Sequence, residues 1–373
     1  MKHFLIRVAA LAHKETLHLI RDTQALWLAL GMPIVLVVLF GYAVTFDLES
    51  MDLVVVDHDK TPESRQLVES FVASTSFRAL TSFDDERRIE PLFRAGRAQG
   101  ALVIPKAYAR SLARGEPAEA QLALDGSDGT STSMALGHAV LVAQSDAVAR
   151  LSSAFPEGLP LEPRTRTWFN PEMRSALFVV PGLVGTVLAI LATLLSALTV
   201  AREWERGSME QLFATPVGRL PIVLGKLLPY VGLGMLQLGL VLAAGVWLFD
   251  VPIRGSLPLL LLSASIFLLA ALGQGFFIST VTKSQQLATQ VGALSAILPS
   301  FLLSGFLFPV RNMPKPLQLI SNAIPARWVL EILRGVMLRG VGLAELWPQL
   351  LSLSFLSLLI VAACTAKFQR NLG

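Results

Sequence analysis

Six long apolar runs constrain the fold of this chain more than any other feature. A helix needs about 20 mostly apolar residues to cross a bilayer. Six runs of that order carry essentially no charge: 25–46, 175–201, 227–249, 257–281, 287–310 and 346–366. The composition agrees, with 53% hydrophobic and only 16% charged residues, whereas soluble domains are about 25% charged. The sequence predicts an α-helical integral membrane protein with six transmembrane helices.

Lysine and arginine near the run ends predict the orientation, because short loops that carry them stay in the cytoplasm. Residues 1–24 and the loop after the second run hold Lys2, Arg7, Lys14, Arg21, Arg202, Arg206, Arg219 and Lys226. Residues 47–174 are then outside, and both termini are cytoplasmic. One region disagrees, since the segment after the fifth run is external by count but holds Arg311, Lys315, Arg327, Arg334 and Arg339.

Residues 1–24 predict an amphipathic helix on the membrane surface. At 100° per residue, its histidine and basic residues gather on one side, and Leu5, Val8, Ala12 and Leu19 gather nearly opposite. No signal-peptidase cleavage site of small residues follows, so we do not expect the segment to be a cleavable signal peptide. Whether this connecting helix touches a partner protein or only anchors the chain stays open.

Residues 47–174, between the first and second runs, are long enough to form a domain. The patterns predict strands at 53–57, 78–83, 101–104 and 120–124, and helices at 62–73, 85–95, 106–114 and 130–155. Alternating strands and helices indicate an inserted extracytoplasmic α/β domain. Asp57, His58 and Asp59 stand where the first strand ends and a turn begins, which explains them without a metal, so no metal site is predicted.

The chain carries no recognisable catalytic motif. The nearest approach to a phosphate-binding GxxxxGK[ST] loop, Gly218 to Lys226, has six residues between its glycines and Leu227 where the hydroxyl belongs. The single cysteine, Cys364, supports neither a disulfide framework nor a thiolate metal site. The net charge of +4 is small and scattered, which fits anionic membrane lipid rather than nucleic acid. We expect no enzyme activity and no cofactor bound by this chain.

The interiors of the runs are also nearly free of ionisable groups. Ion-driven carriers need such groups at membrane depth to bind and release the coupling ion, so a secondary carrier is disfavoured. Gln237 and Gln274 are among the polar side chains in the runs. They either line a pathway or form hydrogen bonds between helices. An uncharged pathway suits hydrophobic or amphipathic cargo.

Two motifs carry a resemblance to a known family. The first is Glu203-x-Glu205-Arg206-Gly207 with Leu212, Thr215-Pro216 and Gly225-Lys226. The second is Ser304-Gly305-Phe306-Leu307-Phe308-Pro309 with Asn312-Met313-Pro314, Ile324-Pro325 and Leu333-Arg334-Gly335. Together with the order of helix, span, domain and five further spans, they resemble the membrane subunit of type-2 ABC exporters. This is the ABC-2 permease family, in particular its bacterial multidrug-efflux-like members with a large domain after the first span.

The resemblance implies roles for both motifs. The first resembles a coupling helix, 202–216, that docks on an ATPase subunit through Glu203, Glu205, Arg206, Gly207, Glu210, Leu212, Thr215 and Pro216. A charged loop that only sets topology is the alternative. The second implies a re-entrant external segment, 311–340, and an outer gate or pathway formed by Gln237, Gln274, Phe306, Leu307, Phe308 and Pro309, although packing alone also explains these residues.

The resulting hypothesis is a permease subunit of an exporter in a bacterial inner membrane. It pairs with a second permease subunit, identical or homologous, and with a separate ABC ATPase that binds ATP and Mg²⁺. Whether a periplasmic adaptor is a further partner stays open. The alternative is a membrane-anchored sensor or mechanotransmission protein that relays signals through its external domain without transport.

Overall fold

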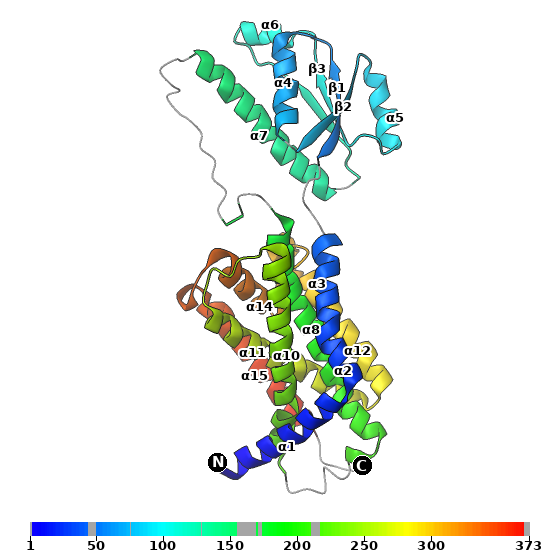
Figure 1. The fold of residues 1–373 in the computed structure, drawn as a ribbon, viewed down its shortest axis with the longest axis vertical. Helices are drawn as coiled ribbons and strands as arrows, with labels where there is room; N and C mark the ends of the chain where they lie inside the picture. The colour runs from blue at the N-terminus through cyan, green and yellow to red at the C-terminus, as the bar shows by residue number, and fades with distance from the viewer. Residues whose placement is uncertain are drawn as a thin grey trace. The chain divides into compact units, whose positions relative to one another are not determined.

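The structure of the chain is a computed structural model that describes residues 2–43, 50–74, 76–127, 129–154, 169–170, 174–209 and 217–368. It divides into two compact units, residues 1–45 with 168–373, and residues 46–167. The first unit is helical, and the second contains a small sheet (Figure 1).

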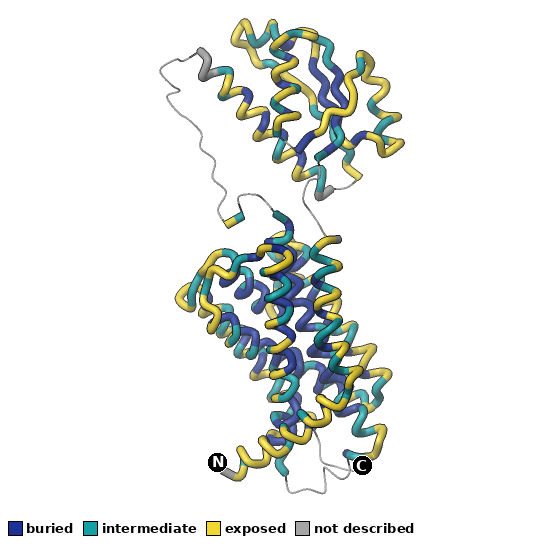
Figure 2. Tube along the Cα trace, viewed as in Figure 1, coloured by how far each residue is buried: buried dark blue, intermediate teal, exposed yellow. Residues whose placement is uncertain are grey.

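Six helices in the described residues are long and apolar enough to cross a membrane, which confirms that prediction. They span Thr23–Tyr42, Ser175–Glu205 (α8), Arg219–Phe249 (α10), Leu257–Thr282 (α11), Gln285–Leu303 and Leu343–Lys367 (α15). Helix α8 is the most buried, and it packs against α10, α11 and the fifth span. Figure 2 shows its buried residues in the middle of the helical unit. The other helices are therefore arranged around α8.

Prolines shape the first and fifth spans. The first consists of α2 (Thr23–Leu26), a π turn at Trp27–Gly31 and α3 (Met32–Ala43). The fifth consists of α12 (Gln285–Leu298) and a π turn at Pro299–Leu303. Proline lacks an N–H and crowds the carbonyl four residues earlier, so widened turns next to Pro33 and at Pro299 are expected.

The fifth span ends earlier than we expected from the apolar run. It stops at Leu303, and Gly305 has a positive φ of 87°. The predicted end at 310 is therefore wrong, because hydropathy does not detect a turn that only glycine adopts easily. The following segment forms a 3₁₀ turn at Val310–Asn312 and two short helices, α13 (Lys315–Ser321) and α14 (Pro325–Arg334). A π turn at Gly335–Arg339 precedes α15.

The N-terminal helix α1 (Lys2–Arg21) packs on α10 rather than standing alone. Val8, Glu15 and Leu19 are buried, whereas Leu5 is exposed. A β-carbon on Gly225 of α10 would lie 2.6 Å from the Cβ atom of Leu11. The absence of a side chain at Gly225 therefore allows the two helices to touch.

The second unit is a four-stranded α/β domain. Its strands β1 (Met51–Asp57), β2 (Phe77–Phe83), β3 (Gly100–Ile104) and β4 (Gln121–Leu124) have the order β2-β1-β3-β4. Strand β1 is parallel to β2 and β3, and β4 is antiparallel to β3. Its helices are α4 (Pro62–Ala73), α5 (Ile89–Arg94), α6 (Tyr108–Ala113) and α7 (Gly129–Ala154), with a 3₁₀ turn at Glu86–Arg88. The predicted strands and helices are all present.

The two faces of this sheet have separate cores. One core joins Leu53, Val55 and Leu102 to apolar residues of α4, α6 and α7. On the other face, Val54 and Ala101 contact residues of α5 and its neighbours. The carboxylates of Asp57 and Asp59 serve the turn before α4, because they accept hydrogen bonds from Lys60 N at 3.0 Å and Thr61 Oγ1 at 2.8 Å, respectively.

Candidate coupling site

The last turn of α8 and its C-cap contain three of the predicted coupling residues, Glu203, Glu205 and Arg206. The helix continues through Glu205, Arg206 caps it, and Gly207 follows with a φ of 69°. A left-handed glycine after the cap is a common way to end a helix. Residues 202–205 therefore belong to the spanning helix and not to a separate short helix. Glu210, Leu212, Thr215 and Pro216 lie outside the described residues.

Lys226 of α10 is the centre of the site. Its side chain is buried, and its Nζ atom lies 2.8 Å from Glu15 Oε1 and 2.6 Å from Glu203 Oε1. Lys14 adds a second ammonium group, 3.4 Å from Glu203 Oε1. A buried charge is tolerated only when it is paired and hydrogen-bonded. The Lys226 triad, formed by Lys226, Glu15 and Glu203, thus joins α1, α8 and α10.

The electrostatics of Glu15 favour its charged form. Burial alone would raise the pKa of this carboxyl, but the charge and hydrogen bond of Lys226 outweigh burial and hold the pKa below its ordinary 4.5. The Oε2 atom of Glu203 is buried and accepts no hydrogen bond from any described residue. One oxygen of Glu203 is therefore held by two ammonium groups, while the other makes no hydrogen bond within the described part of the chain.

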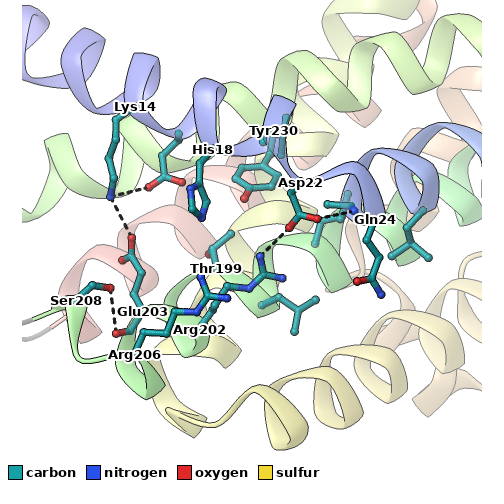
Figure 3. Close-up of a pocket in the computed structure, with 16 residues that line it drawn as sticks. Lys14, His18, Asp22, Gln24, Thr199, Arg202, Glu203, Arg206, Ser208 and Tyr230 are labelled. Carbon is teal, nitrogen blue, oxygen red and sulfur yellow. Dashed lines mark hydrogen bonds and ion pairs between the residues drawn. The ribbon is translucent and has the colours of Figure 1, made fainter.

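A second ion pair fixes the turn between α1 and α2. Arg202 Nη1 lies 2.8 Å from Asp22 Oδ2, and Asp22 Oδ1 accepts a hydrogen bond from Ala25 N at 3.0 Å. The hydrogen bond from Arg202, followed by that from Ala25, lowers the pKa of Asp22. Figure 3 shows this pair beside Lys14 and Glu203, around a cavity of about 450 Å³ between α1, α2, α8 and α10.

Glu205 joins α8 to the start of α12. Its Oε1 atom accepts a hydrogen bond from Gln285 N at 2.7 Å, and its Oε2 atom contacts the Gln285 amide. Carboxylates are favoured at helix N-termini, where backbone N–H groups lack partners. The ammonium of Lys283 lies 4.4 Å from the Trp204 ring centroid. One turn of α8 is thus bonded to α1, α10 and the start of α12.

The predicted coupling residues separate into two groups. Glu203 is partly buried and Glu205 is exposed, and both bond to neighbouring helices of the same chain. Arg206 and Gly207 are exposed, and Arg206 also lines the cavity. The sequence patterns assigned Glu15 and Gln285 no place in the site, and they placed Lys226 in the first motif without naming its partners. One signal pointed to Glu15, because it stands in line with Val8 and Leu19 on the apolar stripe of α1. Nothing local identified its partner Lys226, which is 211 residues away.

The predicted gate residues are not gathered in one place. Phe306 is buried against Gly182 of α8 and Phe301, whereas Phe308 is 58% exposed and Pro309 is also exposed. Leu307 lies between them, partly buried. Arg334 holds this loop by donating hydrogen bonds to the carbonyl oxygens of Gly305 at 2.9 Å and Phe306 at 3.4 Å.

The two glutamines lie elsewhere in the helical unit. Gln274 donates hydrogen bonds to the carbonyl and hydroxyl oxygens of Ser295, both at 3.1 Å, and lines a cavity of about 190 Å³. Gln237 is buried in α10, and its Nε2 atom donates to none of the described residues. Gln237 does not line the cavity beside Gln274. The hydrogen bonds of Gln274 fit a role between helices.

Comparison with known proteins identifies the family. Residues 24–365 match the family model for ABC-2 family transporter proteins. The probable multidrug ABC transporter permease YbhS of Escherichia coli is 34% identical over 339 residues, which cover 90% of this chain and 89% of YbhS. The probable multidrug ABC transporter permease YbhR is 29% identical, covering 98% and 99% of the two chains. The inner membrane transport permease YhhJ is 27% identical and covers 86% of each. This chain therefore belongs to the ABC-2 transporter family, as a membrane-spanning permease.

Proposed function

We propose that this chain moves hydrophobic or amphipathic cargo, drug-like or lipid-like, out of the cell using ATP hydrolysed by a separate ATPase subunit. The observation that carries the proposal is the Lys226 triad, which bonds the last turn of α8 to α1 and α10 directly before the helix break at Gly207. Displacement of the chain after Gly207 by a partner would therefore move three helices together.

Helix α8 provides the mechanical link across the membrane. At one end it bears Glu203 of the triad, and near the other end Gly182 touches the Phe306 ring. With a rise of about 1.5 Å per residue, roughly 30 Å of helix separates these residues, close to the thickness of the hydrocarbon core. In this proposal, a push at Glu203 reaches the Phe306 loop through one rigid element.

The proposal also assigns sides and partners. The α1 end of the helical unit faces the cytoplasm, both termini are cytoplasmic, and the α/β domain is extracytoplasmic. Two permease subunits, identical or homologous, work with an ABC ATPase that binds ATP and Mg²⁺, in a bacterial inner membrane. Supporting observations are the family match and the names of the relatives, which are ABC transporter permeases of Escherichia coli. The word multidrug in two of those names supports drug-like cargo.

The direct test is labelling of the exposed Arg206 in a purified complex with the ATPase. A variant with Cys364 replaced by serine and Arg206→Cys is reacted with a bulky maleimide. We expect the modified complex to lose cargo-stimulated ATP hydrolysis or the ATPase itself. A matched variant, Leu343→Cys, places the same group on an exposed residue at the start of α15. Unchanged stimulation after complete modification of Arg206→Cys would refute the proposed docking position.

The rival function, a sensor or mechanotransmission protein, predicts a different result in vesicles. If the chain transports, proteoliposomes that contain it and its ATPase accumulate a fluorescent amphipath in an ATP-dependent manner. If it only relays a signal, ATP is hydrolysed without accumulation. The Glu203→Gln variant adds a second criterion, because weakening the triad should reduce transport and stimulated hydrolysis together.

A further inference from the structure

The α/β domain contains an apolar groove that its own helices leave uncovered. Strand β4 pairs only with β3 in the described sheet and forms its edge. Next to it, a cavity of about 550 Å³ is floored by Leu102 and Leu122 and walled by Leu112 of α6 and Val140 and Ala143 of α7. Ligand cavities of roughly 300–1,000 Å³ with mostly apolar walls are typical of sites for small molecules.

Tyr108 supplies the polar group that such a site needs. It lines the cavity and is only 6% exposed, yet its hydroxyl forms no hydrogen bond with any residue that the structure describes. Burial raises the pKa of this hydroxyl, so the group stays protonated and able both to donate and to accept. The hydroxyl oxygen itself is not fully buried, so water or a ligand in the cavity can reach it and complete its hydrogen bonds.

The charged groups around the groove indicate which ligands fit. The carboxylate of Asp146 already accepts two hydrogen bonds, one from Arg150 Nε at 2.6 Å and one from Ser70 Oγ at 3.2 Å. Arg150 also donates to the carbonyl oxygen of Glu63 at 3.0 Å. Glu119 lines the same cavity and is exposed. The rim therefore carries an exposed negative charge, while the positive charge of Arg150 is paired.

We propose that this groove binds a small amphipathic molecule, uncharged or cationic, with its apolar body against Leu112, Leu122 and Val140 and a hydrogen-bonding group at the Tyr108 hydroxyl. The site lies within the α/β domain and does not depend on the coupling site or on the direction of transport. It gives the domain a binding role of its own.

The probe for the test is N-phenyl-1-naphthylamine, an uncharged amphipath whose N–H can donate to the Tyr108 oxygen. The full chain is labelled with 3-fluorotyrosine and placed in lipid nanodiscs. Its sequence has three tyrosines, at positions 42, 108 and 230, and Tyr108→Phe assigns the ¹⁹F resonance of Tyr108. We expect that resonance to shift and to saturate as the probe is added.

Two variants on α7 separate binding in the groove from partition into lipid. Ala143→Leu fills the cavity, whereas Ala149→Leu makes the same change at an exposed position that does not line it. We expect Ala143→Leu to raise the midpoint at least about tenfold, about 1.4 kcal/mol, and Ala149→Leu to leave it within about twofold. No shift at Tyr108, a shift that does not saturate, or equal midpoints in the two variants would overturn the proposal.

The charge preference is tested with 1-anilinonaphthalene-8-sulfonate, which has the same body and adds a negative charge. We expect it to bind several-fold more weakly than the uncharged probe, and Glu119→Gln to reduce this difference. Equal or tighter binding of the anionic probe to the unmodified chain would overturn the assignment of an uncharged or cationic ligand.

Discussion

Gly225 gives the sharpest test of how α1 is held against α10. A β-carbon there would lie 2.6 Å from Leu11 Cβ and 3.2 Å from the Val8 carbonyl oxygen. Carbon atoms pack at about 3.5–4.0 Å, so Gly225→Ala must displace α1 by roughly 1 Å. Overpacking of this kind costs about 1–3 kcal/mol, which lowers the equilibrium constant for docking of α1 by about 5- to 150-fold.

Hydrogen–deuterium exchange of the α1 amides measures this loss. In Gly225→Ala, we expect faster exchange throughout α1 and weaker cargo stimulation of the ATPase. The control is Gly232→Ala on the same helix, where a β-carbon would meet nothing within 4 Å. Equal exchange in Gly225→Ala and the unmodified protein would show that α1 does not depend on this contact, and equal acceleration in both variants would point to a general loss of helix packing.

Three further predictions concern the triad and the Phe306 loop. The lowered pKa of Glu15 means that its contribution to stability is present above about pH 4.5 and is lost as the pH falls through the folded-state value. The protection of the α1 amides, relative to their intrinsic exchange rate at each pH, should therefore fall only in acid. Lys226→Met leaves the carboxylates of Glu15 and Glu203 without their buried partner and should destabilise the helical unit by about 3–5 kcal/mol, measured by thermal unfolding. Gly182→Ala places a β-carbon in direct clash with the Phe306 ring and should expose the loop to exchange.

Each of these three predictions has a control variant or an outcome that would contradict it. Constant protection of the α1 amides down to pH 3 would contradict the role of Glu15. If the triad reasoning is right, Glu15→Gln combined with Lys226→Met is more stable than Lys226→Met alone, because one buried charge is removed. For the loop, Gly185→Ala is the control, since its nearest atom would be 3.5 Å away; a larger effect there than at Gly182 would refute the packing argument.

The sequence predicted the spans and the α/β domain well because both depend on local patterns. Long apolar runs and strand–helix alternation leave clear signals over 5 to 30 residues. The helix ends were less accurate. The second and third apolar runs are 175–201 and 227–249, but α8 extends through Arg202 to Glu205 and α10 already begins at Arg219. Charged residues leave the hydrocarbon core of the membrane, yet they do not end a helix. The boundary of a run therefore marks hydrophobicity and not helix length.

The candidate site could be predicted only in part, because its bonds are long-range. The coupling motif includes both Glu203 and Lys226, but the sequence patterns assigned Lys226 no role beyond that motif and the charge of its loop. Nothing in the sequence pairs Lys226 with Glu15. Likewise, the motif around Phe306 was noticed, but the opposite burial of Phe306 and Phe308 depends on Gly182 and on the turn at Gly305. Local patterns identify the segments, and tertiary packing decides which side chains meet.

The division into two units has a consequence for how this protein responds to heat and to mutation. The cores of the α/β domain consist only of its own residues, and the Lys226 triad consists only of residues of the helical unit. Units with separate cores can unfold in separate cooperative transitions, since a multi-domain chain need not unfold in one step. Calorimetry should therefore resolve two melting events, with Leu102→Ala lowering one and Lys226→Met the other. The permease would then be modular, and its α/β domain could be exchanged between relatives without redesign of the helices that cross the membrane.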